Sequence, residues 1–352
     1  MKPTSANSNL SARVWIVCGI ALACATASSL LLAQQPGAKS DTKSATKSDT
    51  KSGTKAAPAA TAASAVSSAT AAKTFATAQQ AADALVDAAD KFDVVALTQI
   101  FGSQGSDIVF SGEFAQDRKH AADFVSEARE KKSVSIDPKT GTRAFLLVGK
   151  EDWPFPVPIV QRAGRWSFDA NAGREELLYR RIGANELDAI DICHGYVEAQ
   201  DDYAVEQRML YNVNQYAQRI LSTPGTKDGL AWQNPDGTWG GPVGENIAKA
   251  IEQGYNVGSE PYHGYFFKIL KGQGPAAPLG QMDYVVKGLM IGGFALVASP
   301  AEYEVTGVRT FIVSNDGVVY EKDLGPQTLD EFKKMELFNP DNSWAPVQEN
   351  PE

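Results

Sequence analysis

The stretch "DICHGYVEAQDDYAVEQR", residues 191–208, decides how the C-terminal half of the chain is built. When the residues are plotted at about 100° each, the apolar side chains here and just before form two stripes on nearly opposite sides of a helix. One stripe holds Leu187 and Cys193, and the other holds Tyr196 and Tyr203. A helix that is apolar on two sides is usually covered on two sides. We therefore predict that this helix packs between its own sheet and a second layer of protein.

The same stretch places His194 among carboxylates and next to a thiol. In a helix, Glu198 and Asp201 fall beside this imidazole, one and two turns further on. Such a pair commonly satisfies a partly buried histidine, and this structural interpretation is our prediction. The alternative is a catalytic cluster of His194, Glu198 and Asp201. We predict no metal site, because no second histidine lies nearby in the sequence.

The N-terminus has the pattern of an export signal, with Lys2 and Arg13 ahead of an apolar run over residues 14–33. We predict that residues 1–33 are an export signal or a membrane anchor. The protein is then periplasmic or extracellular.

The processing of this signal has several open alternatives. Cleavage after Ala27 follows a small-x-small pattern, whereas cleavage after Ala33 matches the end of the apolar run. Residues 14–33 are also long enough to stay uncut, as a tether to the cytoplasmic membrane. Cys24 offers a third route, in which the chain is processed as a lipoprotein.

A four-residue repeat follows the signal, "KSDTKSATKSDTKSGTK" at residues 39–55. Its lysines recur at every fourth position, but the Ser, Thr and Gly residues between them oppose a stable helix. Nothing in this part offers an apolar face to bury. We therefore predict that residues 34–73 are a disordered tether.

The charge of the chain is unevenly distributed. Of its 33 basic and 42 acidic residues, eight basic and two acidic ones lie in residues 1–73, which leaves 25 and 40 for the rest. A part this acidic is repelled by phosphate backbones and anionic lipids, so we exclude nucleic acid as a partner. Cys193 is the single cysteine after residue 73, so no disulfide can form within that part.

Residues 74–183 are predicted to form an N-terminal α+β domain, because helix patterns come first and strand patterns follow. Apolar spacing predicts three helices, at residues 74–90, 92–102 and 113–131. Strand patterns follow at residues 143–150 and 155–161. The order resembles the cystatin-like and nuclear-transport-factor-like folds, in which a curved antiparallel sheet wraps a helix.

Residues 184–345 are predicted to form a second α+β domain. We expect a hinge at residues 173–187, and Asn185 is a plausible N-cap for the helix that follows. The turn at 315–317, Asn-Asp-Gly, is a strong hairpin signal because glycine supplies a positive φ. Further strands are expected at residues 263–270, 292–300 and 306–323, and short helices at 244–256 and 329–334.

Several segments together resemble a bacterial exported family, the domain of unknown function 2950. They are "RRIGANEL", "YVEAQDDYA", "HGYFFKIL" and "GFALVASPAEYEVTGVRTFIVSNDGVVYEKDLG", along with the export signal. The resemblance extends from about residue 75 to residue 344. It implies a secreted or envelope-associated protein, and it implies no activity and no catalytic residues.

The C-terminal part alone resembles the globular domain of type IV pilins and pseudopilins. A long helix is followed by "GYFF", "FALVASP" and "TGVRTFIVSNDGVVY". Pilins begin with a hydrophobic helix that assembles the filament, whereas this chain begins with an export signal and an additional domain. The resemblance therefore implies a scaffold for interaction rather than a filament subunit.

The loop bracketed by Trp232 and Trp239 is a candidate binding site. Exposed aromatic rings beside Asp236 could stack on the rings of a sugar. The alternative is a packed loop with buried tryptophans. The spacing lacks the regular oxygen ligands of a calcium loop. We take Trp232, Asp236 and Trp239 as the candidate binding residues.

Catalytic motifs give no support for an enzyme. The sequence has no Gly-Lys-Ser/Thr phosphate loop, no G-x-S-x-G elbow and no H-E-x-x-H zinc motif. The carboxylates Glu151, Asp152 and Asp169 are expected in solvated loops. We predict an exported envelope protein without a cofactor that binds an unknown envelope protein or a glycan. The alternative is a hydrolase of cell-wall or other glycan polymers, using His194, Glu198 and Asp201 or the carboxylates of 151–169.

Overall fold

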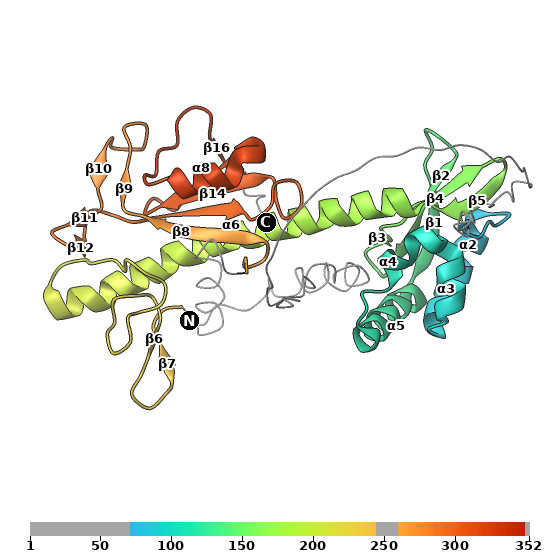
Figure 1. Ribbon diagram of the computed structural model, residues 1–352, viewed down its shortest axis with the longest axis horizontal. Helices are drawn as coiled ribbons and strands as arrows, with labels where there is room; N and C mark the ends of the chain where they lie inside the picture. Colours follow the sequence, from blue (N-terminus) through green and yellow to red (C-terminus); the bar gives the residue numbers. More distant parts are fainter. Residues whose placement is uncertain (1–70, 244–259, 349–352) are drawn as a thin grey trace, which may run out of the picture. The chain divides into compact units, whose positions relative to one another are not determined.

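The computed structural model of the chain describes residues 71–243 and 260–348 (Figure 1). The predicted export signal and its cleavage sites, nearly all of the predicted linker, and the predicted helix at 244–256 lie outside the described residues. Among the residues described, no helix is long and apolar enough to span a bilayer. The chain is α+β, with antiparallel sheets and six α-helices in its described part.

The described residues divide into two compact units between Asn171 and Ala172. We call them the N-terminal unit and the C-terminal unit. The predicted domain boundary at 183–184 falls inside α6, a helix that spans Ala170–Tyr211.

The expected hinge at 173–187 and the expected N-cap at Asn185 are wrong, because α6 runs through both. This stretch is rich in Glu, Leu and Arg, which favour helix, and a glycine such as Gly183 opposes it by only about 1 kcal/mol. Asn185 is buried inside the helix, and its Nδ2 donates a hydrogen bond to the Thr306 carbonyl oxygen at 2.8 Å. The side chain therefore ties α6 to a distant loop instead of capping it.

The N-terminal unit begins with helices, and all three predicted helices are confirmed. Thr77 caps the first by accepting a hydrogen bond from the Gln80 N–H at 3.1 Å, and Asp93 caps the second by accepting one from the Ala96 N–H at 3.0 Å. The elements are α2 (Ala78–Asp90), α3 (Val94–Phe101), η1 (Ser103–Gly105), α4 (Ser106–Val109) and α5 (Phe114–Glu130).

An antiparallel sheet follows in the same unit, with the order β1-β2-β4-β5 and with β3 paired to β2. Its strands are β1 (Lys132–Ile136), β2 (Arg143–Val148), β3 (Trp153–Pro154), β4 (Ile159–Arg162) and β5 (Arg165–Phe168). Alternate residues of β2 are buried. Aromatic rings fill the core, for example Phe101 and Phe168 with centroids 5.1 Å apart. The sheet thus carries the helices on its apolar face.

The main sheet of the C-terminal unit has the order β16-β15-β14-β13-β8 and is antiparallel throughout. Its strands are β8 (Tyr265–Leu270), β13 (Ala295–Pro300), β14 (Arg309–Ser314), β15 (Val319–Asp323) and β16 (Ala345–Pro346). The predicted strands here are confirmed, and so is the hairpin turn, where Gly317 has a φ of 77°. Every residue of β13 is buried, so both faces of the sheet are covered.

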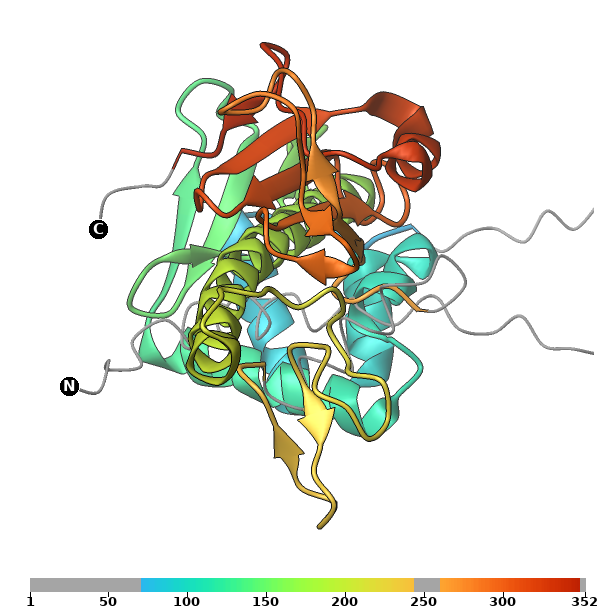
Figure 2. The same ribbon diagram turned by 90° about the vertical axis from the view of Figure 1, so that its left-hand side faces the viewer.

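Helices cover the two faces of this sheet (Figures 1 and 2). On one face, Leu296 of β13 shares an apolar core with Tyr196 and Ala199 of α6. On the other, Lys268 of β8 donates a hydrogen bond to the Phe332 carbonyl oxygen of α8 (Thr328–Lys334) at 2.8 Å. Shorter elements complete the unit: β6 (Trp232–Gln233) with β7 (Trp239–Gly240), β9 (Gly272–Gln273) with β10 (Met282–Asp283), β11 (Val285–Val286) with β12 (Leu289–Met290), and η2 (Gly325–Gln327).

The stripe prediction for α6 holds in its central part. Cys193, Tyr196 and Tyr203 are at most 3% exposed. Leu187, which the projection placed on the first stripe, is instead 65% exposed, so the buried part of this stripe begins after Leu187. Gln200 is fully buried and bonds to both backbone groups of Ala217, which ties the chain after α6 back to the helix.

Candidate functional site

A cavity of about 400 Å³ opens beside α6 in the C-terminal unit. Its walls come from α6, from the segment 220–243 that follows it, from the turn at Tyr262 and His263, and from β13. The floor is apolar and belongs to the core of the unit. The floor residues Tyr196, Ala199, Ile220, Leu230 and Leu296 are at most 4% exposed. Packing therefore fixes the floor in advance of any ligand.

Four carboxylates of α6 line this cavity: Asp188, Asp191, Glu198 and Asp202. Together with Gly195 they repeat at intervals of three and four residues, so they lie within an arc of about 80° on the helix surface. Among the described residues, Asp191, Glu198 and Asp202 form no hydrogen bond or ion pair. The helix therefore presents a stripe of free negative charge to the cavity.

His263 reaches the cavity from a tight turn. Two backbone hydrogen bonds between Tyr262 and Tyr265, of 3.0 and 2.9 Å, close this turn. His263 and Gly264 both have a positive φ, 46° and 75°. Nδ1 of His263 hydrogen-bonds to a carboxylate oxygen of Asp188. The turn and α6 are thereby joined at the rim of the cavity.

Burial changes the titration of two groups in the lining. It raises the pKa of the Asp191 carboxyl above the ordinary value, the charge of Asp188 raises that pKa further, and His194 lowers it. The pKa of the Tyr262 phenol is also raised, first by burial and then by Asp188. Perturbed groups gathered in a concave site are typical of functional positions.

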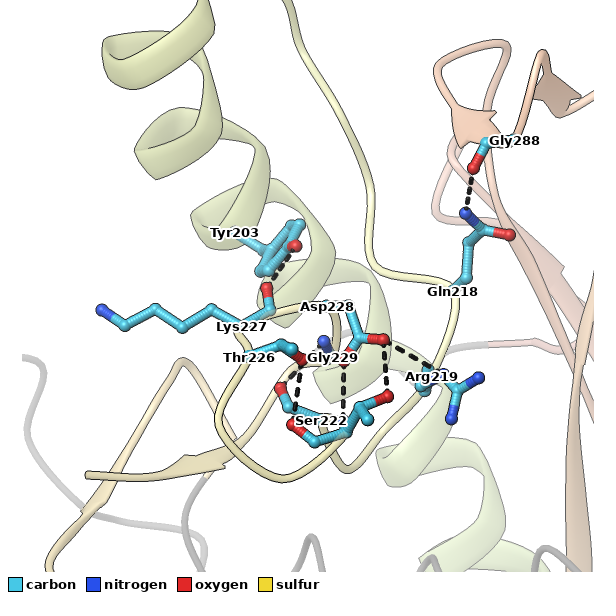
Figure 3. Close-up of polar contacts among 10 residues, drawn as sticks. Tyr203, Gln218, Arg219, Ser222, Thr226, Lys227, Asp228, Gly229 and Gly288 are labelled. Carbon is cyan, nitrogen blue, oxygen red and sulfur yellow. Dashed lines mark hydrogen bonds and ion pairs between the residues drawn. The ribbon is translucent and has the colours of Figure 1, made fainter. Parts of the chain in front are cut away.

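A hydrogen-bond network holds the loop at residues 222–229, which joins the lining residues Ile220 and Leu230 (Figure 3). The Asp228 carboxylate accepts hydrogen bonds from the backbone N–H and the hydroxyl of Thr223, at 2.7 and 2.9 Å. The Tyr203 hydroxyl of α6 donates to the Lys227 carbonyl oxygen at 2.7 Å. These bonds fix the position at which Leu230 enters the wall.

The family model described as Protein of unknown function (DUF2950) matches residues 72–347, which include both units and the whole cavity. The chain belongs to the DUF2950 family. The resemblance noted from the sequence segments is thereby confirmed. No curated protein and no solved structure matches the chain.

The cavity of this DUF2950 chain does not gather the three residues of the alternative catalytic cluster. Of His194, Glu198 and Asp201, only Glu198 lines the cavity. The imidazole that lines the cavity is that of His263. Cys193 is fully buried, which raises the pKa of its thiol to about 12, so the thiol stays protonated near neutral pH.

The predicted binding residues lie on the hairpin formed by β6 and β7. Trp232 is 7% exposed, and Nζ of Lys227 lies 4.5 Å from the centre of its ring. Trp239 is half-buried. Asp236 accepts hydrogen bonds from the Thr238 hydroxyl and N–H at 2.6 and 3.0 Å, which lower the pKa of its carboxyl. Trp232 therefore packs inside the hairpin, and Trp239 is the more exposed ring of the two.

Two of the candidate carboxylates of the N-terminal unit have basic partners. Asp152 pairs with Lys131 at 2.5 Å, and Asp169 pairs with Arg162 at 2.7 Å. Neutralised carboxylates of this kind are typical of a solvated surface.

The residues predicted from the sequence did not include Asp188, Asp191, Asp202, Tyr262 and His263. The spacing of the acidic residues on α6 was a usable signal, since a helical projection that starts at Asp188 places them on one face. The position of His263 had no such signal. It lies 75 residues after Asp188, and only the fold brings the two together.

Proposed function

We propose that the chain is an exported protein of the cell envelope that binds a small ligand in the cavity beside α6, without catalysis. The observation that carries the proposal is the cavity itself, with its volume of about 400 Å³, apolar floor and convergent polar groups. This combination is typical of small-molecule sites.

Two further observations support this proposal, one on the absence of catalysis by Cys193 and one on export. The thiol of Cys193 is buried and protonated, so it is not available as a nucleophile. The sequence pattern of residues 1–33 supports export, and the repeat after it supports a tether that holds the folded part away from the membrane.

The arrangement of elements also supports the two fold-level resemblances as proposals. In the C-terminal unit, the long helix α6 lies against an antiparallel sheet, as in the globular domain of pilins. In the N-terminal unit, helices precede an antiparallel sheet that carries them, as in cystatin-like and nuclear-transport-factor-like folds. We propose that both units are binding scaffolds of these types.

A second candidate function is hydrolysis of a glycan polymer. The hydrogen bond between His263 and Asp188 favours it, because a carboxylate that orients an imidazole is a common arrangement for a general base. Glu198 then supplies a second carboxyl group in the same cavity. Release of reducing ends from purified cell-wall glycan, lost in His263→Asn and Glu198→Gln, would favour this candidate over binding alone.

A substitution that fills the cavity tests the proposed function. Gly195 lines the cavity, and a Cβ placed on it has no neighbour within 4 Å, so Gly195→Trp adds a large side chain at the mouth. Gly183 lies on the same helix with equally open space and outside the cavity, so Gly183→Trp is the matched control. Both variants should fold, since glycine is the less favourable residue in a helix.

The measurement is thermal unfolding of the full chain against a panel of small amines, alcohols, carboxylic acids, sugars and cell-wall fragments. We expect at least one compound to raise the midpoint in the parent and in Gly183→Trp but not in Gly195→Trp, because a ligand stabilises only the state that binds it. A panel without any such compound, or shifts that Gly195→Trp preserves, would contradict the proposal.

A further inference from the structure

The cavity beside α6 carries an unbalanced charge. Asp188, Asp191, Glu198 and Asp202 line it, and within the described part of the chain no Lys or Arg does. His263 hydrogen-bonds to Asp188. The other three carboxylates form no hydrogen bond or ion pair with any described residue. The cavity therefore carries negative charge that no positively charged side chain of its lining balances.

The apolar floor makes this charge effective. Ile192 and Val243 of the lining are partly exposed, so a ligand above them displaces water from both the apolar lining and the carboxylates. Charges interact more strongly where water is excluded. A ligand with an apolar body covers the floor, and a positive group on that body meets several carboxylates.

A metal ion does not match this arrangement. In the described part of the chain, no three His, Cys, Asp or Glu side chains converge closely enough to hold one. Asp188 and Asp202 stand about 21 Å apart along the helix axis, at about 1.5 Å per residue. A calcium ion gathers its six to eight oxygen ligands at about 2.3–2.6 Å. Carboxylates spread along a stripe instead suit a larger cation that need not touch all of them.

An aromatic rim adds a second attraction for such a cation. The rings of Tyr262 and His263 lie with centroids 4.2 Å apart at the edge of the cavity, next to Asp188. The face of a tyrosine ring attracts ammonium and guanidinium groups.

We infer that the cavity binds a small organic cation, an ammonium or guanidinium group carried on an apolar body. This inference rests on the proposed function, because it names the class of ligand for the same cavity. The volume of about 400 Å³ is that of a site for a small molecule.

Three probes that share one aromatic body and differ in charge test the inference. They are 2-phenylethylamine, 2-phenylethanol and 3-phenylpropionate, titrated calorimetrically into the full chain at low ionic strength, where charge is least screened. We expect the amine to bind about tenfold or more tightly than the alcohol, and the carboxylate to bind most weakly.

Neighbouring residues provide a matched pair of variants. Asp202 lines the cavity and Asp201 does not, although both are exposed residues of the same helix. Asp202→Asn and Glu198→Gln should each weaken binding of the amine by about tenfold and leave the alcohol unaffected. Asp201→Asn has the same change in net charge and should bind the amine as the parent does.

Each other outcome overturns the inference. If the alcohol or the carboxylate binds as tightly as the amine and Gly195→Trp blocks it, the cavity is a binding site but its ligand is not a cation. If Asp201→Asn weakens the amine as much as Asp202→Asn, the effect is one of net charge and not of this site. If none of the three probes binds, the inference fails, and the unfolding panel with Gly195→Trp decides separately whether the proposed function fails with it.

Discussion

Single residues of α6 show what helical periodicity settles and what it does not. The burial of Cys193 and Tyr196 follows from their spacing alone, because residues on one helix face share one environment. The partner of Asp188 does not follow, because His263 arrives from a turn at the start of a strand distant in sequence. The neighbours of His194 in the sequence made it the candidate imidazole. In the fold, it is His263 that lines the cavity.

Asp191 is expected to destabilise the fold at neutral pH. Its raised pKa means that the folded state holds the proton more tightly than the unfolded state, so its contribution to stability falls as the pH rises through that pKa. Asp191→Asn should therefore raise the free energy of unfolding at pH 7, measured with urea. The gain should shrink as the pH falls through the raised pKa towards the ordinary aspartate pKa of 3.8.

Asp236→Asn is the control of opposite sign. Hydrogen bonds from Thr238 lower the pKa of Asp236, so this carboxylate stabilises the folded state above the unfolded pKa, and the contribution is lost as the pH falls through the lowered folded value. This variant should be less stable than the parent at pH 7. A loss of stability in Asp191→Asn at pH 7 would contradict the prediction that ionised Asp191 destabilises the folded state.

At the scale of elements, α6 organises the C-terminal unit. The helix was expected from sequence, but its continuity through 173–187 was not, because glycine and asparagine are ambiguous signals that tertiary contacts decide. Oε1 of Glu186 accepts hydrogen bonds from the N–H groups of Val308 and Arg309, at 2.8 and 3.0 Å. The turn at 262–265 approaches α6 so closely that it requires glycine, since a Cβ on Gly264 would lie 2.6 Å from Nδ2 of Asn185.

Removing the Glu186 anchor should destabilise the chain measurably. Glu186→Ala leaves two backbone N–H groups without their acceptor, at a cost of about 2 kcal/mol in the free energy of unfolding. Urea denaturation followed by tryptophan fluorescence measures it. Glu175→Ala on the same helix is the control, because Glu175 makes no hydrogen bond or ion pair with described residues, and it should stay within about 0.5 kcal/mol of the parent. Equal effects of the two variants would refute the anchor.

At the scale of the whole molecule, the family match over 72–347 covers both units, and the export pattern lies before it. The α+β class and the antiparallel sheets could be predicted from apolar spacing and turn residues, because those signals are local. The cavity could not, because its walls come from four segments that meet only in the fold.

Export is testable with the N-terminal residues alone. Residues 1–73 fused to a phosphatase that folds only outside the cytoplasm should give an active enzyme. Ile16→Asp with Leu22→Asp places charge in the apolar run and should abolish the activity, whereas Thr46→Asp in the repeat should not. Equal activity in the three fusions would refute export through this segment.

An NMR titration shows where on the chain the ligand binds. Isotope-labelled chain is titrated with 2-phenylethylamine, and the shifts of the backbone amides are mapped. We expect saturable shifts at Gly195, Glu198 and Tyr262, which line the cavity. Shifts confined to the hairpin of Trp232 and Trp239, or no saturable shift at the cavity, would contradict this expectation.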